Sequence, residues 1–379
     1  MFDVIIAGAG PAGAVAATVL ARGGARVLVL DRARFPRDKL CGDTINPGTR
    51  AVLLRLGLTR RFEDRALRID GMIVTGERGI AVRSEYGGDV HGLAILRRDL
   101  DAALVEEARA AGARVEEGVL VRKPLIESDA GCTRVRGIVM AGRDGRDIRI
   151  PAPLVIAADG RRSRVCVALG IIRHPARPRR WAIGAYFEGV EGITSLGEMH
   201  VRSGRYIGVA PVPSGLVNVC LVTANRDGFD DPAALLTRVI AQDWHLAERF
   251  TSARMATRPV VMGPLAVDAV EESVSGLLLA GDASGFIDPM TGDGLRFAIC
   301  GGELAAKVAL RALDRTLENP EAALARVRRR TFAAKWRFNR GLRALVSAGP
   351  AVHAAGVAAS IAPLLLRRLV TFAGDVSQV

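Results

Sequence analysis

The first 31 residues constrain the fold of this chain more than any other stretch. An apolar run at residues 4–7 stops at a glycine, and an Ala-rich stretch that favours a helix follows to about Arg22. A second apolar run, residues 26–30, ends in Asp31. The turn between the first run and the helix has Gly-x-Gly-x-x-Gly spacing, at Gly8, Gly10 and Gly13. This order of strand, glycine turn, helix, second strand and terminal acid predicts a dinucleotide-binding βαβ unit.

Each glycine of this turn has a separate physical role. Gly8 permits the sharp turn, Gly10 leaves room for a pyrophosphate at the backbone, and Gly13 lets the helix pack closely on the strand. The free N–H groups at the helix N-terminus attract phosphate. Asp31 is placed to accept from ribose hydroxyls, and its charge argues against a 2′-phosphate on the nucleotide. The predicted cofactor turn consists of Gly8, Gly10, Pro11, Ala12 and Gly13.

The composition favours a globular protein with more than one module. The chain has 379 residues, of which 49% are apolar, so a large core is expected. The formal net charge of +13 could suggest nucleic acid, but the arginines are dispersed and only 4% of residues are aromatic. The segment from Glu318 to the end concentrates the charge, with ten Lys or Arg against three acids. We therefore expect no nucleic-acid partner, and favour an anionic substrate or a membrane surface.

Cysteine and histidine usage favours a reducing compartment. The five cysteines are widely separated and form no C-x-x-C pair, which predicts neither a disulfide framework nor a zinc site. The five histidines show no ligand spacing, so no metal is expected. Because the chain begins directly with the nucleotide-binding strand and no basic segment precedes it, we expect no signal peptide and a cytoplasmic location.

Two further glycine-containing segments follow buried strands. One is Asp159-Gly160, after the apolar run at 154–158, and the other is Gly281-Asp282, after a Leu-Leu-Leu-Ala run. Gly292 and Gly294 continue the second segment up to the start of a helix near residue 295. Glycines leave backbone N–H groups open, so this segment is expected to contact a phosphate and a flat ring.

With these motifs in order, residues 1–310 resemble the flavoproteins of the para-hydroxybenzoate hydroxylase fold, and within them the geranylgeranyl reductase group. The resemblance implies FAD as cofactor, with the glycine turn at its pyrophosphate and Asp31 at the adenosine ribose. It also implies contacts from Arg97 at a helix start, from the Asp-Gly fingerprint, and from the acid of the Gly-Asp motif. The cofactor residues implied outside the first turn are Asp31, Arg32, Arg37, Cys41, Gly42, Arg97, Asp159, Gly160, Gly281, Asp282, Gly292 and Gly294.

The subgroup assignment depends on residues 35–42, which are similar to the F-P-R-x-K-x-C-G signature of geranylgeranyl reductases. Related flavin halogenases share the Phe-Pro-Arg start but carry a W-x-W-x-I-P segment, for which this chain has no match. In the reductases the matching cysteine lies beside the cofactor, which implies a catalytic role for Cys41. The alternative is that Cys41 is a buried packing residue.

Residues 206–211 and 218–219 resemble the substrate strands of the same group, Y-x-W-x-F-P and N-V-G. The Trp, Phe and final Gly of that pattern are altered here. The resemblance implies substrate contacts for Tyr206, Pro211 and Asn218.

The predicted fold is α/β. A Rossmann-like FAD/NAD(P)-binding domain of glutathione-reductase type carries an inserted antiparallel-β substrate domain and a helical C-terminal tail. We expect the discontinuous FAD-binding domain to comprise residues 1–67, 95–175 and 256–315. The β-rich substrate domain would comprise 68–94 and 176–255, with one helix near 232–250. Residues 316–379 would form the basic and apolar C-terminal region, with a helix near 320–345.

The uncharged run at 344–366 is 23 residues long, but Gly349, Pro350, Gly356 and Pro363 interrupt it. Broken helices that cover a pocket or lie on a membrane are expected here, in preference to a membrane span.

The function implied by the resemblance is FAD-dependent reduction of carbon–carbon double bonds in a hydrophobic, isoprenoid-like molecule. Two alternatives stay open: a monooxygenase of the same fold that hydroxylates or epoxidises an aromatic or polyketide-like substrate, and a flavin-binding protein without turnover. Only one nucleotide-binding motif is evident in the sequence. A nicotinamide donor, NAD(P)H, would therefore dock transiently, or an electron-donor protein would replace it.

Overall fold

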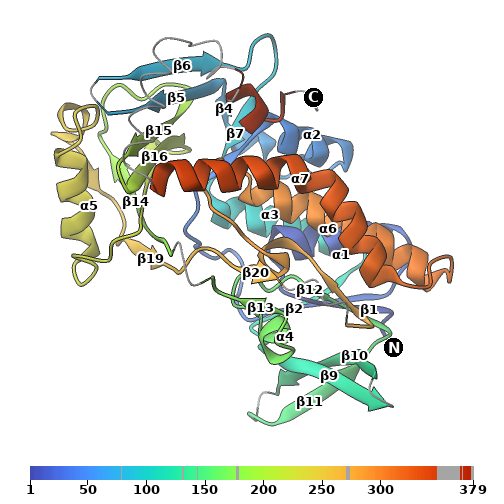
Figure 1. Cartoon of the computed structure of the whole chain (residues 1–379). Helices are drawn as coiled ribbons and strands as arrows, with labels where there is room; N and C mark the ends of the chain where they lie inside the picture. The colour runs from blue at the N-terminus through green and yellow to red at the C-terminus, as the bar shows by residue number, and fades with distance from the viewer. Residues whose placement is uncertain are drawn as a thin grey trace.

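The structure is a computed structural model that describes residues 1–77, 79–129, 132–142, 144–175, 179–269, 274–347, 368 and 370–376. The half that is expected to bind the cofactor, called the cofactor half below, is built on a five-stranded parallel sheet (Figure 1). The strands, in spatial order, are β21 (Leu277–Leu279), β12 (Leu154–Ala157), β1 (Val4–Ala7), β2 (Val27–Asp31) and β8 (Arg114–Glu117). The predicted α/β fold with a Rossmann-like sheet is confirmed.

Strand β1 is buried on both faces, and its alternate residues belong to two different cores. Val4 and Ile6 pack with the helical layer, whereas Ile5 and Ala7 face a β-meander. The helical layer contains α1 (Pro11–Arg22), α3 (Arg97–Ala110) and α6 (Gly294–Leu313). The meander consists of β9 (Val121–Asp129), β10 (Cys132–Ala141) and β11 (Asp147–Pro151), on the opposite side of the sheet (Figure 1). The apolar run at residues 4–7 is therefore the middle of three layers.

A second, eight-stranded sheet forms the other half of the protein. Its order is β18 (Arg254–Met255), β14 (Trp181–Glu188), β17 (Leu216–Thr223), β16 (Arg205–Val212), β15 (Leu196–Arg202), β5 (Gly71–Thr75) and β6 (Ala81–Glu85), and β19 (Val260–Met262) also pairs with β14. The sheet is antiparallel as predicted at its other strand pairs, but β15 and β5 run parallel. These two strands come from separate excursions of the chain, so no hairpin sets their direction.

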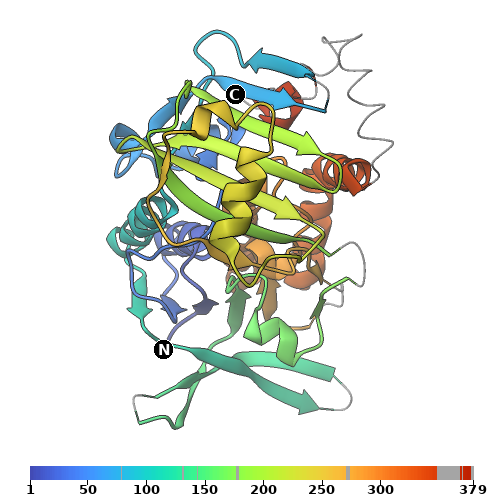
Figure 2. The same cartoon turned by 90° about the vertical axis from the view of Figure 1, so that its left-hand side faces the viewer.

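Helix α5 (Pro232–Ala241) covers the outer face of the eight-stranded sheet (Figure 2). The helix predicted near 232–250 is too long, since α5 ends at Ala241 and only a 3-10 turn, Glu248–Phe250, follows. Asp243 explains the early end. Its carboxylate accepts from the backbone N–H of His245 and from Arg202, so a local polar turn replaces the next helical turn.

Shorter elements connect the two halves. They are the sheet of β3 (Thr44–Ile45), β7 (Gly92–Ala94) and β4 (Leu67–Ile69), the pair β13 (Ile172–Arg173) and β20 (Asp268–Ala269), the helices α2 (Pro47–Arg55) and α4 (Arg164–Ala168), and the 3-10 turns Glu63–Arg65 and Gly281–Ser284. The predicted domain bounds stay a prediction.

The C-terminal region begins with α7 (Pro320–Ser347), close to the helix expected at 320–345. Most of the 344–366 run lies outside the described residues. Among the residues that are described, no helix is both long enough and apolar enough to cross a membrane.

The N-terminus of α1 is held by glycines on three sides. A Cβ on Gly13 would lie 1.9 Å from the carbonyl oxygen of Gly8, and a Cβ on Gly302 in α6 would lie 2.2 Å from the carbonyl oxygen of Ala12. A Cβ on Gly281 would lie 2.9 Å from the Ala12 methyl group. Such distances are far inside van der Waals contact, so the position of α1 depends on these residues remaining glycine.

We predict opposite effects for two glycine substitutions inside helices. Gly302→Ala forces α6 away from the Ala12 carbonyl and should lower the free energy of unfolding by about 1–3 kcal/mol. Gly341→Ala in α7 meets no atom within 4 Å and should raise it by about 0.5–1 kcal/mol, because alanine favours a helix. Urea unfolding of both variants measures the difference. Equal stabilities would contradict the close approach of α1 and α6.

Candidate functional site

The glycine turn between β1 and α1 separates packing positions from one open position. Gly8 has φ of 96°, and a Cβ there would lie 2.5 Å from the carbonyl oxygen of Ala158. Gly13 is also closed, as described above. Gly10 is different, because the nearest atom to a Cβ there is Nη2 of Arg37 at 3.7 Å. The turn thus leaves backbone open only at Gly10, beside a guanidinium, which fits the pyrophosphate of a dinucleotide such as FAD.

Asp31 lies at the end of β2 and holds the glycine turn in place. Its Oδ2 accepts from the backbone N–H of Ala9 at 2.7 Å, and its Oδ1 accepts from Ala33 at 2.8 Å. Each carboxylate oxygen keeps capacity for a further donor, so a ribose hydroxyl can still bind. Arg32 is exposed and does not line the central pocket. The roles of both residues at the adenosine end stay predictions.

A buried carboxylate holds two arginines at the turn. Asp101, fully buried in α3, accepts from Nε and Nη2 of Arg97 at 3.0 Å each, and lies 3.1 Å from Nη2 of Arg37. Arg97 is itself 5% exposed. Sequence reasoning missed Asp101, although its i, i+4 spacing from Arg97 was a usable signal. Asp101 therefore holds the guanidinium of Arg97 at the pocket and the guanidinium of Arg37 beside Gly10.

The two later fingerprints follow neighbouring parallel strands, β12 and β21, so their carboxyl ends meet at one edge. Gly160, Gly281 and Asp282 line the pocket there, and Asp282 pairs with Arg161 at 3.9 Å. Asp159 does not line the pocket. Its Oδ2 accepts from the backbone N–H of Arg164 at the start of α4, and burial raises the pKa of its carboxyl.

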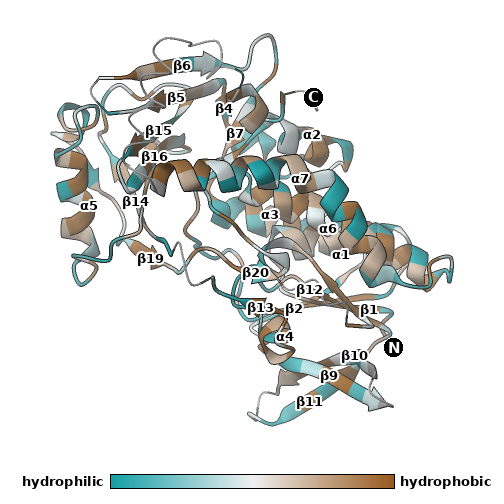
Figure 3. Ribbon diagram, in the orientation of Figure 1, coloured by the Kyte–Doolittle hydropathy of each residue, from teal (hydrophilic) through white to brown (hydrophobic). Residues whose placement is uncertain are grey.

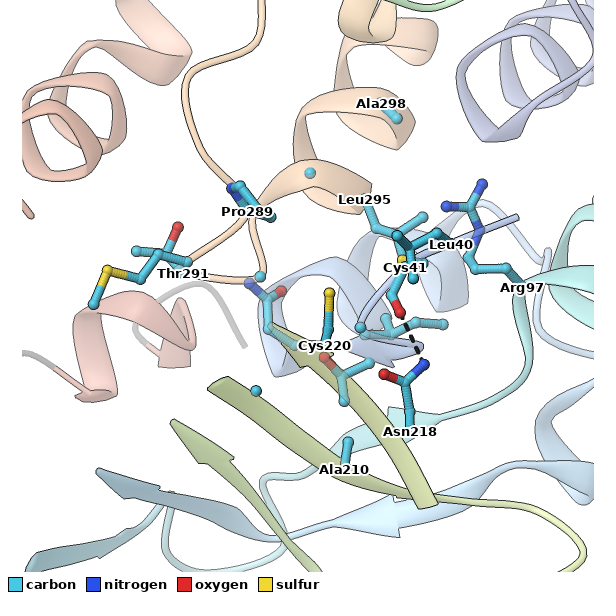
Figure 4. A pocket seen from close by; sticks show the side chains of 18 of the residues that line it. Leu40, Cys41, Arg97, Ala210, Asn218, Cys220, Pro289, Thr291, Leu295 and Ala298 are labelled. Atoms are coloured by element: carbon cyan, nitrogen blue, oxygen red, sulfur yellow. Dashed lines mark hydrogen bonds between the residues drawn. The ribbon is translucent and has the colours of Figure 1, made fainter. Parts of the chain in front are cut away.

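The pocket lies between this cofactor edge and the inner face of the eight-stranded sheet (Figure 4). Strand register places Cys220 and Met199 on either side of Gly208, and Asn218 beside Ala210. Side chains alternate along a strand, so these residues share one face. Predicted cofactor residues that line the pocket are Gly10, Pro11, Ala12, Cys41, Gly42, Arg97, Gly160, Gly281, Asp282, Gly292 and Gly294.

Of the three predicted substrate residues, only Asn218 lines this pocket. Tyr206 is 2% exposed, and its hydroxyl donates to Asp288 at 2.6 Å. Asp288 also pairs with Arg180 at 3.2 Å, so Tyr206 joins a buried polar network. Pro211 falls on the alternate face of β16 from Ala210, because the period of a strand is two.

Cys41 is half-buried and lies between residues from both halves of the protein. Its backbone oxygen accepts from Nδ2 of Asn218 at 2.8 Å, the bond drawn in Figure 4, and the charge of its side chain helps to raise the pKa of the nearby Arg97 guanidinium. Two neighbours were missed in the sequence. Cys220 follows Asn218 by two residues and lines the pocket, and burial raises the pKa of its thiol to about 12. Asp43 is fully buried behind Gly42.

The described C-terminal residues also reach the pocket. Ala373 and Gly374 line it, and Nζ of Lys335 in α7 donates to the carbonyl oxygens of Phe372 at 2.7 Å and Ala373 at 2.9 Å. Residues 373 and 374 therefore form part of the pocket wall.

One group of potential metal ligands emerges that sequence spacing did not indicate. Oxygen and nitrogen atoms of Glu198, His200 and His245 lie within 4.8 Å of one another. Both oxygens of Glu198 accept from Arg249 at 2.7 Å, and one accepts from Nε2 of His200 at 3.0 Å. Because the carboxylate is already satisfied by a guanidinium, this group is an ion-pair network between β15 and the segment that follows α5.

Comparison with known proteins agrees with this geometry. Residues 1–310 match the family described as FAD binding domain. Menaquinone reductase of Mycobacterium tuberculosis is 31% identical over 324 residues, covering 81% of this chain and 76% of its own. Digeranylgeranylglycerophospholipid reductase 2 of Methanopyrus kandleri is 31% identical over 323 residues, covering 83% and 78%. The crystal structure of a flavoprotein/dehydrogenase from Cytophaga hutchinsonii has a TM-score of 0.85 at 23% identity, covering 98% of this chain and 93% of its own.

We predict that Asp31→Ala weakens FAD binding by about 10- to 150-fold, equivalent to roughly 1.5–3 kcal/mol of charge-assisted hydrogen bonding. The change removes the acceptor for Ala9 and Ala33 as well as for the ribose. Asp38→Ala is the matched control, because the Asp38 side chain is 83% exposed in the following loop. Titration of apoprotein with FAD, followed by flavin fluorescence, gives both dissociation constants. Equal affinity in the two variants would exclude a role for Asp31.

Proposed function

Since this chain belongs to the FAD binding domain family and to the geranylgeranyl reductase group of FAD-dependent oxidoreductases, we propose that it reduces carbon–carbon double bonds of a hydrophobic, isoprenoid-like substrate. Bound FAD supplies hydride chemistry. One observation supports this proposal above the others: a single pocket joins the glycine turn and Cys41 to an apolar sheet face. The two relatives are named as reductases of a menaquinone and of a digeranylgeranylglycerophospholipid, which agrees with a lipid-like substrate.

The pocket lining suits a long, flexible hydrocarbon. Four methionines line it: Met72, Met199, Met262 and Met290. Methionine side chains are unbranched and polarisable, so they adapt to irregular apolar surfaces. Small residues of the sheet provide the space between them, at Ala182, Gly197, Gly208 and Ala210. Such a lining binds by dispersion and burial, and it excludes water from the reacting carbon atoms.

Two polar residues of the pocket, Arg97 and Asn218, accompany Cys41. Asn218 holds the backbone carbonyl of Cys41 and Arg97 lines the same pocket, so Cys41 lies at the junction of the cofactor edge and the sheet. Reduction of a carbon–carbon double bond needs a hydride at one carbon and a proton at the other. We assign delivery of that proton, or control of its delivery, to Cys41. The electron donor is a transiently docked NAD(P)H or a partner protein.

Product mass tests the proposed reaction. Reduced holoenzyme and an unsaturated isoprenoid lipid should give a product heavier by about two mass units for each double bond reduced, without oxygen consumption. A gain of about sixteen units with oxygen uptake would replace the proposal with a monooxygenase. Flavin that no donor reduces would favour a non-catalytic role.

Cys41→Ser is the informative variant in the same assay. Serine preserves the volume but is far less acidic than cysteine, so turnover should fall at least about tenfold, or roughly 1.4 kcal/mol of barrier, while FAD stays bound. Cys300→Ser is the control, because Cys300 is buried in α6 and does not line the pocket. Equal turnover of the two variants would show that Cys41 is a packing residue without a role in proton delivery.

We also propose that α7 contacts an anionic membrane surface. Arg326, Arg330, Arg337 and Arg340 are exposed, and their spacing puts them on one side of the helix. Figure 3 shows strongly hydrophilic stretches along α7. Each basic residue near an anionic bilayer contributes about 1 kcal/mol of attraction, which salt screens.

Vesicle co-sedimentation tests this surface. The protein should bind vesicles of phosphatidylcholine with phosphatidylglycerol, release them in high salt, and not bind phosphatidylcholine alone. Arg326→Glu, Arg330→Glu and Arg337→Glu combined should abolish binding. The control reverses three exposed arginines on other elements, Arg83, Arg114 and Arg146. Equal binding by both triple variants would reject a membrane contact through α7.

A further inference from the structure

Asp43 is a fully buried acid beside the proposed reaction site. It follows Cys41 and Gly42 directly, has no exposed surface, and has φ of 54°. Its Oδ1 accepts from the backbone N–H of Arg97 at 3.0 Å. Its Oδ2 accepts from the hydroxyl of Tyr186 at 2.6 Å and from Nδ2 of Asn218. The carboxylate therefore receives three donors in a place that water does not reach.

These donors belong to elements that are distant in the sequence. Arg97 begins α3 in the cofactor half, whereas Tyr186 and Asn218 lie on β14 and β17 of the eight-stranded sheet. Asn218 also donates to the carbonyl oxygen of Cys41, and the backbone N–H of Ile95 donates to the carbonyl oxygen of Asp43. Residues 41–43 are thus hydrogen-bonded to both halves of the protein, and most of these bonds are made by Asp43.

We propose that Asp43 is a positioning residue, whose ionised carboxylate holds Cys41 and Gly42 against the cofactor edge and makes turnover depend on its ionisation. This inference rests on the proposed reductase function. Asp43 does not line the pocket itself and acts through Cys41 and Asn218. A misplacement of about 1 Å in a reacting group can cost about 100-fold in rate, which sets the scale of the effect.

The chemistry of the donors explains why the ionised form is required. All three neighbours donate to the carboxylate. A protonated carboxyl could donate only to the Tyr186 hydroxyl, which would then have to turn its own hydrogen away, and the shared Oδ2 would accept less well from Asn218. Burial raises the pKa of Asp43 to about 6, while the bonds from Tyr186, Asn218 and Arg97 favour the charged form. The other groups nearby are the Arg97 guanidinium and the thiols of Cys41 and Cys220.

The sign of the pH effect follows from this pKa. At pH 7 the carboxylate exceeds the acid form about tenfold, and below pH 6 the acid form predominates. Turnover should therefore fall as the pH is lowered through about 6. Removing the Tyr186 bond destabilises the carboxylate and should move this fall to higher pH.

The experiment measures pH profiles of turnover for three variants of the holoenzyme. Asp43→Asn should lower turnover at pH 7.5 by about 10- to 100-fold. It should also remove the fall of turnover at low pH, which is the acid limb of the profile. Tyr186→Phe should keep the limb and shift it upward in pH. Tyr206→Phe is the matched control, since its hydroxyl bonds to Asp288 and not to Asp43, and its limb should stay in place. An unmoved limb in Tyr186→Phe, or equal shifts in both tyrosine variants, would overturn the proposal, even if Asp43→Asn does not fold.

Two readouts do not depend on substrate, so they separate this inference from the proposed function. Infrared titration of the holoenzyme should show a protonated carboxyl band that appears near pH 6, is absent in Asp43→Asn and is shifted in Tyr186→Phe. Iodoacetamide should alkylate Cys41 several-fold faster in Asp43→Asn than in the parent, with Cys300, which is buried in α6 and does not line the pocket, as internal reference. If no lipid is reduced but both readouts respond, the proposed reaction is wrong and the positioning role of Asp43 is supported. If neither readout responds, the positioning role of Asp43 is wrong.

Discussion

The close approach of α1 to its neighbours is the constraint on which the rest of the structure depends. Gly13, Gly281 and Gly302 bring the start of this helix against β1, the turn after β21 and α6, at distances that any side chain would prevent. The same contact brings the three glycine-containing segments to one edge of the parallel sheet, where the helix N-terminus has free N–H groups. Cofactor binding and core packing therefore have a common cause in backbone proximity.

The central fold could be predicted from the sequence because its signals are local. Strand, turn, helix and acid follow one another within 31 residues, and each is visible as a run or a spacing. The substrate sheet was predicted less well. Its parallel pair joins Leu196 to Gly71, far apart in the sequence, and no local pattern encodes that direction. Helix α5 ends at Ala241 because Asp243 bonds with Arg202 of another strand, a tertiary effect that overrides local helical tendency.

The same distinction between local signals and tertiary contacts applies to the residues of the candidate site. The glycine turn, Arg97 and Cys41 were found from motifs, and they line one pocket or hold its edge. Asp43 was missed because it reads as an ordinary polar loop residue until Tyr186, 143 positions later, is brought against it. Tyr206 shows the opposite case. It matched a substrate motif, but its hydroxyl is used in a buried bond to Asp288. Motifs identify which residues can act, and only the packing decides which way they point.

One face of the eight-stranded sheet packs against α5, and the other face lines the pocket. On the outer face Ile207, Val219 and Leu221 pack with α5, whereas the pocket face carries Gly208 and Ala210. Small residues on the pocket face thus enlarge the space between the sheet and the cofactor edge. Residues that set the shape of the pocket are therefore not the residues that keep the sheet folded. Selectivity for substrate size can then change through single enlargements on one face, while the stability of the domain, carried by the other face, is left largely intact.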